Sequence, residues 1–282
     1  MPSDWVGEAR RVFLPLAMRV GGGFVRVDAH TVGRMDECPA RAGFSDWTGW
    51  DAAKARRQLA LAVLHRHKDG TTDLAAAALD VADELAAEGN AGAARPRVGD
   101  WLASLDRAGR AMAAREAGWW AAAVAGSLTR PLGRSQVITD GSVRWQPDRD
   151  TGLTLTAPLD VVRGGLLLVS AAGPPGPSDR HRAGAAALLW ALLRREAAEV
   201  VVVHPTSRVR VRMRVDEALL QESFDAYAAA ATALVQAAIG AEPAARLPGR
   251  WCGGCPLLAD CPEGQDWCAT HPRWVGGLPL RA

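Results

Sequence analysis

The stretch SVRWQPDRDTGLTLTAPLDVVRGGLLLVSAAG, residues 142–173, indicates the fold of this chain. It contains three short runs, SVRWQP, GLTLTAPLDVV and GLLLVSAAG, which are apolar or alternate apolar and polar residues. Asp, Gly and Pro separate them. Such runs predict β-strands, and the intervening DRDTG predicts a hairpin between the first two. A β-sheet is therefore expected in the middle of the chain.

Further helices and strands are expected on both sides of this stretch. They are strands at 23–30, 200–205 and 208–215, and helices at 51–67, 71–89, from about Asp100 onward, at 178–199 and at 216–242. This order predicts an α/β fold, with a mixed central sheet flanked by helices. The expected divisions are an N-terminal strand and helical region at 1–135, an α/β core at 136–248 and a cysteine-rich segment at 249–282.

Composition restricts the classes of protein to be considered. The 282 residues are 49% hydrophobic, and 33 basic side chains nearly balance 31 acidic ones. Net charge therefore does not indicate a nucleic-acid partner, and a basic surface would have to arise from local clustering. We find neither a secretion signal nor the roughly 20 apolar residues of a membrane helix, so we expect a cytoplasmic protein. Clustered cysteines in that compartment indicate metal or redox chemistry.

Four of the five cysteines lie close together near the C-terminus. Cys252, Cys255 and Cys261 have the spacing C-x2-C-x5-C, and two glycines between the first pair permit a tight turn. Thiolates are soft ligands that suit zinc or an iron–sulfur cluster, and either centre usually needs four ligands. The fourth is Cys268, in a local zinc site, or the distant Cys38. The alternative is that all are free, buried thiols.

The run CGGCPLLADCP, 252–262, resembles the closing motif of RecB-family nucleases of the PD-(D/E)XK superfamily, which include AddB-type and CRISPR-associated exonucleases with an iron–sulfur cluster. The family also has a cysteine in a Cys-Pro-x-Arg context near its N-terminus, and the run from Cys38 to Arg41 has this pattern. The resemblance implies a nuclease-like fold and a [4Fe–4S] cluster bound by Cys38, Cys252, Cys255 and Cys261. Cys268 is then not a ligand.

The resemblance also implies a nuclease centre, and this sequence departs from it. Family members hold divalent metal with an Asp on one strand and an Asp-x-Lys on the next. Asp160 lies where the first Asp is expected, but the next strand has VSAAG at 169–173. We therefore treat Asp160 as only a weak catalytic candidate. His65 is expected to be a solvated residue at a helix end, and Trp190 lies where the family commonly has Tyr.

Two other groups of side chains are candidates for binding. Arginines alternate with apolar residues in RVRVRMRV, so one strand face would present Arg208, Arg210, Arg212 and Arg214 to phosphates. The alternative is the charged face of a protected edge strand. Trp251, Trp267 and Trp274 flank the cysteines and are expected to pack over the metal centre.

These observations together predict a catalytically inactive, iron–sulfur-containing, RecB-like protein. It would bind DNA or RNA, or act as a scaffold with a protein partner in a DNA-processing assembly, and no membrane association is expected. One alternative is an active metal-dependent nuclease with a rearranged site around Asp160. Another is a regulatory protein whose cluster senses redox state.

Overall fold

The computed structural model describes residues 4–35, 37–40, 52–67, 73–88, 98–126, 137–163, 165–171, 175–194, 199–204, 207, 209–241, 244–255 and 257–271. The chain forms two compact units. The first comprises 1–46, 144–156 and 221–282, and the second comprises 47–143 and 157–220. Each unit is built from segments that are distant in sequence.

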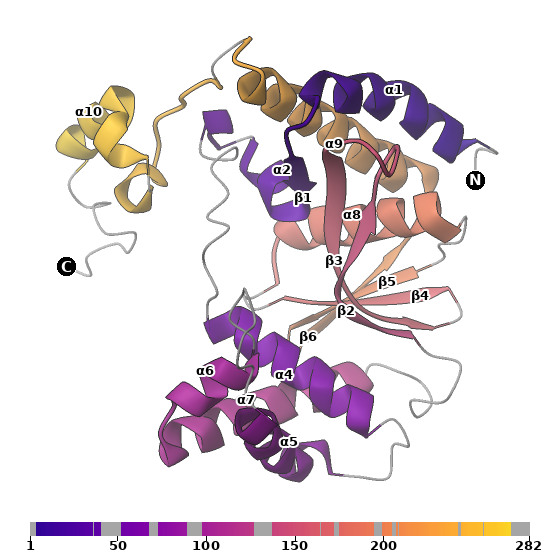
Figure 1. Cartoon of the computed structure of the whole chain (residues 1–282), viewed down its shortest axis with the longest axis vertical. Coiled ribbons are helices and arrows are strands. Elements are labelled where there is room, and N and C mark those ends of the chain that lie inside the picture. Colours follow the sequence, from indigo (N-terminus) through magenta and orange to yellow (C-terminus); the bar gives the residue numbers. More distant parts are fainter. Residues whose placement is uncertain are drawn as a thin grey trace. The chain divides into compact units, whose positions relative to one another are not determined.

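The strands form one mixed sheet, as the sequence predicts (Figure 1). They are β1 (Val25–Asp28), β2 (Val137–Trp145), β3 (Leu153–Arg163), β4 (Leu166–Ser170), β5 (Glu199–His204) and β6 (Val209–Arg214). The order is β1-β3-β4-β5-β6, and β2 also pairs with β3. The β1–β3 and β4–β5 pairs are parallel, whereas the β3–β4 and β5–β6 pairs are antiparallel. The prediction of a mixed α/β sheet is confirmed.

The helices agree with the sequence expectations in most places. They are α1 (Trp5–Val20), α2 (Ala29–Met35), α4 (Ala52–Arg66), α5 (Leu74–Glu88), α6 (Val98–Ser104), α7 (Arg107–Ala125), α8 (Ser178–Arg194), α9 (Glu217–Ala238) and α10 (Pro262–Thr270), with short 3-10 turns η1 (Cys252–Gly254) and η2 (Leu258–Asp260). The helix expected from Asp100 is in fact two helices. The second helix begins after Asp106, whose carboxylate accepts the Gly109 N–H at 2.7 Å and caps the N-terminus of α7.

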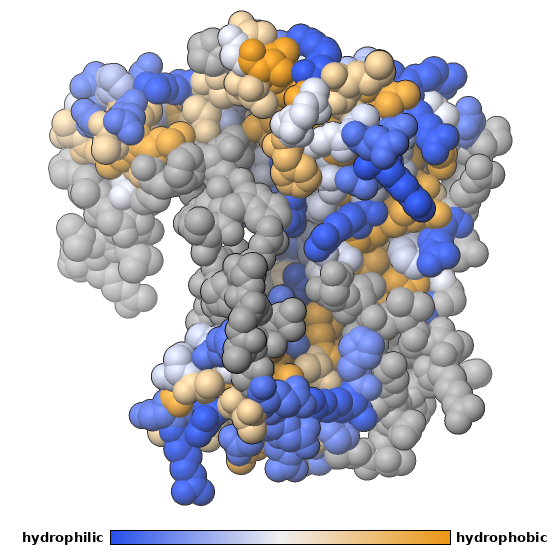
Figure 2. All heavy atoms as spheres, in the orientation of Figure 1, coloured by the Kyte–Doolittle hydropathy of each residue, from blue (hydrophilic) through white to orange (hydrophobic). Residues whose placement is uncertain are grey.

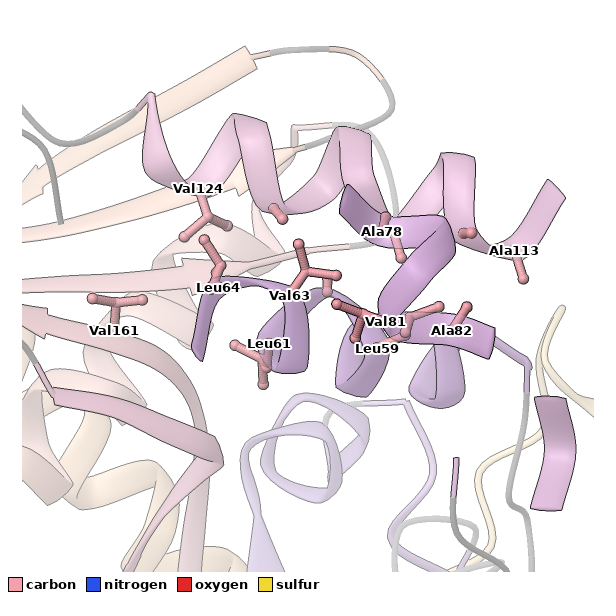
Figure 3. Packing of buried hydrophobic residues seen from close by; sticks show 14 of the residues in the cluster. Leu59, Leu61, Val63, Leu64, Ala78, Val81, Ala82, Ala113, Val124 and Val161 are labelled. Atoms are coloured by element: carbon pink, nitrogen blue, oxygen red, sulfur yellow. The ribbon is translucent and has the colours of Figure 1, made fainter. Parts of the chain in front are cut away.

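Small residues allow the helices of the second unit to pack closely. A Cβ added at Gly118 in α7 would lie 2.7 Å from the Ala75 Cα in α5, so only glycine fits this crossing. Leu59, Leu64 and other side chains of α4 complete an apolar core that reaches Val161 on β3 (Figure 3). The outward surface of these helices is mainly hydrophilic (Figure 2), as expected of amphipathic helices. In the same unit α8 packs against β4 and β5.

Aromatic side chains form the core of the first unit. The Phe13 ring of α1 lies 5.9 Å from that of Trp145 at the end of β2 and 5.5 Å from that of Phe224 in α9, both edge-on. The Trp5 ring also contacts Phe224, at 5.6 Å. The Tyr227 hydroxyl, also in α9, donates to the Thr156 carbonyl of β3 at 2.7 Å. These contacts fix α1 and α9 on one face of the β1–β3–β2 part of the sheet.

None of the helices within the described ranges is both long enough and apolar enough to span a bilayer.

Candidate functional site

Four cysteines line one small cavity in the first unit. They are Cys38, Cys252, Cys255 and Cys261, the four that the sequence analysis grouped. The space between them that a water-sized sphere can enter is about 20 Å³, roughly enough for one water molecule. The walls are mostly apolar, although Arg246 also lines the cavity and the Cys261 thiol donates to the Glu263 carboxylate at 3.6 Å.

Backbone hydrogen bonds hold the distant Cys38 against the C-terminal segment. The Cys38 N–H donates to the Arg34 carbonyl at 2.9 Å, just after the end of α2. Two residues further on, the Ala40 N–H donates to the Ala245 carbonyl at 3.0 Å. The Cys38 sulfur lies 4.0 Å from that same carbonyl oxygen. Segments more than 200 positions apart therefore meet beside the cavity.

A tight turn orients the first two cysteines of the C-x2-C-x5-C motif. The chain turns through η1, where the Cys255 N–H donates to the Cys252 carbonyl at 3.0 Å. The Gly249 N–H donates to the Cys252 sulfur at 3.3 Å. The glycines predicted to permit a turn thus form one, and a backbone N–H is directed at the sulfur, as is favourable for a thiolate.

Gly264 in α10 leaves room for two of the sulfurs. A Cβ added there would lie 3.3 Å from the Cys261 sulfur and 3.5 Å from the Cys252 sulfur. Both sulfurs therefore lie against the same part of α10, where the Leu258 side chain would also be 3.2 Å from that Cβ. The sequence analysis did not identify Gly264, because a glycine within a short helix after a proline gives no signal of its own.

The thiols also influence one another electrostatically. Burial raises the pKa of the Cys252 thiol, the hydrogen bond from Gly249 opposes this rise, and negative charge on Cys268, Cys255 or Cys261 adds to it. Cys268, buried in α10, is thus close to Cys252, although it is not one of the described residues that line the cavity. The geometry groups Cys38 with the three motif cysteines and places Cys268 beside the group.

The four cysteine sulfurs meet some of the requirements of a metal centre but not all of them. Four thiols around one cavity match the soft ligands of zinc or an iron–sulfur cluster. However, among the residues that the structure describes, no three Cys, His, Asp or Glu side chains are arranged tightly enough to hold an ion. The residues therefore fit a thiolate centre in type and location, and the sulfurs would have to converge for coordination.

The predicted tryptophans have different environments. Trp251 lines the cavity, and its indole N–H donates to the Leu247 carbonyl at 2.9 Å. Trp267 stacks on the His271 ring, with ring centres 4.5 Å apart. Trp274 lies outside the described residues. Of the two tryptophans that the structure describes here, Trp251 is the one that lines the cavity and could shield the thiols.

Asp160, the weak catalytic candidate, is sequestered in the second unit. It lies on β3 with 1% of its surface exposed. One carboxylate oxygen accepts from the Arg57 Nε at 2.8 Å and lies 2.7 Å from the Arg57 Nη2. The other oxygen accepts from the backbone N–H and hydroxyl of Ser170 on β4, each at 2.5 Å. Arg57, in α4, also donates to the Gly141 carbonyl of β2 at 2.9 Å.

Asp179, the described acid that follows next along the chain, belongs to a different group of side chains. Asp179 at the start of α8 is 1% exposed and lies 3.0 Å from the His204 Nε2 and 3.1 Å from the Arg182 Nη1. Glu196 lies outside the described residues. His65 is exposed in the last turn of α4, as expected. The indole N–H of Trp190 is buried without a hydrogen-bond partner among the described residues.

The arginines of β6 are exposed, but two have structural neighbours. Arg212 forms an ion pair with Glu199 of β5 at 3.1 Å. The Arg210 guanidinium lies over the C-terminal end of α7, 3.1 Å from where a Cβ at Gly126 would be. A cation there is favourable because the carboxyl end of a helix carries partial negative charge. Arg214 is exposed, and Arg208 lies outside the described residues. Phosphate binding by this row stays a prediction.

Comparison of this chain with protein-family models, with curated proteins and with solved structures finds no match.

Proposed function

We propose that this chain is a RecB-like, PD-(D/E)XK-type nuclease relative that binds nucleic acid without cutting it, and that its cysteines bind a metal centre that joins the two ends of the chain. The observation that carries this proposal is the burial of Asp160 and its ion pair with Arg57. Its carboxylate is buried and already neutralised by Arg57.

The neighbours of Asp160 support the relationship and also the loss of activity. The resemblance places a metal-binding Asp on one strand and a second acid with a lysine on the next. Here Asp160 and Ser170 lie on the neighbouring strands β3 and β4 and contact each other. Ser170 supplies hydrogen-bond donors where a nuclease needs a second carboxylate. A divalent cation would have to displace Arg57, and the neighbouring strand β4, Leu166–Ser170, offers it no carboxylate.

The metal centre would be held by Cys38, Cys252, Cys255 and Cys261. A [4Fe–4S] cluster is favoured by the resemblance, and zinc is the alternative. Such a centre contributes folding free energy, because its ligands come together only in the folded chain. The chain's own residues have defined roles in this proposal: Gly249 donates to one sulfur, Gly264 leaves room for two, and Trp251 limits the access of water.

Metal analysis of the anaerobically purified protein tests the centre. Four irons with acid-labile sulfide and broad visible absorption are expected for the cluster, and one zinc without colour for the alternative. Cys38→Ala should abolish metal binding, whereas the matched Cys268→Ala should retain it. Loss of metal in Cys268→Ala together with retention in Cys38→Ala would instead support the local four-cysteine site. Protein without any bound metal would overturn the proposal.

A nuclease assay tests the proposed lack of catalysis. End-labelled single- and double-stranded DNA should stay intact with excess Mg²⁺ or Mn²⁺. Removing a single charge-stabilising group typically costs about 10²–10³ in rate, and here both an acid and a lysine are missing. Degradation by the wild type that disappears in Asp160→Ala would show an active site and overturn this part of the proposal. Degradation that persists in Asp160→Ala would indicate a contaminant or a catalytic site elsewhere in the chain.

A further inference from the structure

One face of α7, in the second unit, exposes a line of residues that the core of that unit does not use. Two of them are large and apolar: Met112 is 53% exposed and Trp119 is 50% exposed. Because residues three or four positions apart lie on one side of a helix, the exposed residues of α7 and its C-cap form a single stripe. The members of this stripe are Ala108, Met112, Arg115, Trp119, Ala122 and Gly126.

A guanidinium group packs on the exposed tryptophan of the stripe. The Arg115 Cζ lies 5.3 Å from the centre of the Trp119 ring, which is the geometry of a cation–π contact. The two residues are one helical turn apart, so this contact forms along the stripe and not across the helix. Half of Trp119 still faces solvent. The pair therefore presents an aromatic surface with a fixed positive charge beside it.

A second guanidinium group, from β6, reaches the C-terminal end of the same stripe. The Arg210 Nη2 lies 3.1 Å from where a Cβ on Gly126 would be. Gly126 follows Trp119 by seven residues and has helical dihedral angles, so it lies on the same face about 10 Å further along the axis. Cations from two different elements of the second unit thus lie along the stripe, with Trp119 between Arg115 and Gly126.

The charge of the stripe restricts what it can bind. Its members include no acid, and neither Arg115 nor Arg210 forms an ion pair with a residue that the structure describes. An apolar partner helix packed on this face would bury both guanidinium groups without a counter-charge, which is costly. A ligand that combines flat apolar groups with negative charges would match both features of the surface.

We infer that this stripe binds single-stranded nucleic acid, with one base stacked on Trp119 and phosphates bound by Arg115 and Arg210. Bases stack on exposed aromatic side chains whatever their sequence, and arginine binds phosphate oxygens in pairs. A single strand is required because the faces of a base in a duplex are covered by its neighbours. The inference rests on the proposed function and deepens it, because it names the class of nucleic acid and adds a stacking residue.

Fluorescence anisotropy with a labelled single-stranded DNA tests the role of the aromatic ring. Trp119→Leu should bind about tenfold more weakly, whereas Trp119→Phe should stay close to the wild type because it keeps a ring. A strand of the same length made of abasic sites should bind the wild type and Trp119→Leu equally. Phe24→Leu is the matched control, since Phe24 is another exposed aromatic residue, at 64%, in the first unit. Its affinity should equal that of the wild type.

The same titration over a series of salt concentrations tests the two cations. Arg115→Gln and Arg210→Gln should each weaken binding, and each should reduce the salt dependence by about one phosphate contact. Arg107→Gln is the matched control, because Arg107 is an exposed arginine of α7 that lies on a different side of the helix from the stripe. Its affinity and salt dependence should stay at the wild-type values.

The outcomes separate this inference from the function on which it rests. Wild-type binding that is unchanged in Trp119→Leu would overturn the inference and leave nucleic-acid binding standing. An equal loss on the abasic strand would overturn it too, because Trp119 would then not act by stacking. Equal losses in Arg115→Gln and Arg107→Gln would show an effect of net charge alone and overturn the phosphate contacts. A wild-type protein that binds neither single strands nor duplexes would overturn the proposed function itself.

Discussion

Replacing Arg57 by methionine should destabilise the second unit more than any other single change at an arginine of α4. The substitution keeps most of the apolar length of the side chain and removes its charge. It also removes both Arg57 contacts to Asp160 and the hydrogen bond to the Gly141 carbonyl. The Asp160 carboxylate, 1% exposed, would keep the two hydrogen bonds from Ser170 but would lose its cationic partner.

The size of the effect follows from the burial of the pair. Removing one partner of a buried ion pair costs about 3–5 kcal/mol, because the other charge stays buried. The Arg57 side chain is 23% exposed, so water can partly replace it. We therefore expect a loss of about 2–4 kcal/mol in the free energy of unfolding. Arg57→Met combined with Asp160→Leu should recover part of this loss, since neither charge then remains.

Urea denaturation followed by circular dichroism measures this loss, and Arg56→Met is the matched control. Arg56 neighbours Arg57 in α4, but its ion pair with Glu116 is 35% and 41% exposed on the two sides. Exposed pairs contribute about 0–1 kcal/mol. If the two single variants unfold at the same urea concentration, or if Asp160→Leu does not suppress the effect of Arg57→Met, the buried pair does not stabilise the unit as argued.

Three more predictions concern close packing and buried groups. Gly118→Val should lower the free energy of unfolding of the second unit by about 1–3 kcal/mol, as measured by denaturant unfolding. The reason is that the valine Cβ would lie 2.7 Å from the Ala75 Cα. A variant as stable as the wild type would contradict this close packing. Burial raises the pKa of Tyr227 well above its usual value, so the wild type should lose stability as pH rises above about 10. Tyr227→Phe should lack this alkaline loss while being about 1 kcal/mol less stable near neutral pH, and thermal melts from pH 7 to 11 measure both. Gly264→Ala, with its Cβ 3.3 Å from the Cys261 sulfur, should lower metal content per protein more than it lowers helicity.

The sequence predicted the strands well, because each is a short apolar or alternating run bounded by Gly, Pro or Asp. It predicted the helices less completely. Helix α1 was not recognised, because Pro15 interrupts an apolar run that is short by itself, yet the helix continues through this proline. The break between α6 and α7 was also missed. Its signal was Asp106, a good capping residue followed by Gly109 at the third helical position.

For the candidate sites too, the sequence predicted what local patterns signal and missed contacts between distant residues. The cysteine spacing and the Cys38–Pro39 context grouped four cysteines that line one cavity, because these signals are local or resemble a known motif; their role as ligands stays a prediction. Nothing in the sequence linked Arg57 to Asp160, which lie 103 positions apart. An arginine within a helix has the same local pattern whether its guanidinium reaches solvent or a buried carboxylate. Such pairs depend on the tertiary structure, so the sequence alone does not predict them.

If the chain is the nuclease relative that we propose, the Arg57–Asp160 pair would take over the charge compensation that a metal ion provides in an active nuclease. A carboxylate buried as deeply as Asp160 needs a compensating cation, because an isolated buried charge costs far more than the fold can supply. In a metal-dependent enzyme the divalent ion provides that charge. Here the guanidinium of Arg57 provides it, while Ser170 donates two hydrogen bonds to the other carboxylate oxygen. Under this proposal the acid is kept for stability. The cysteine segment would be under separate selection, since its cavity lies in the first unit and contains none of these residues.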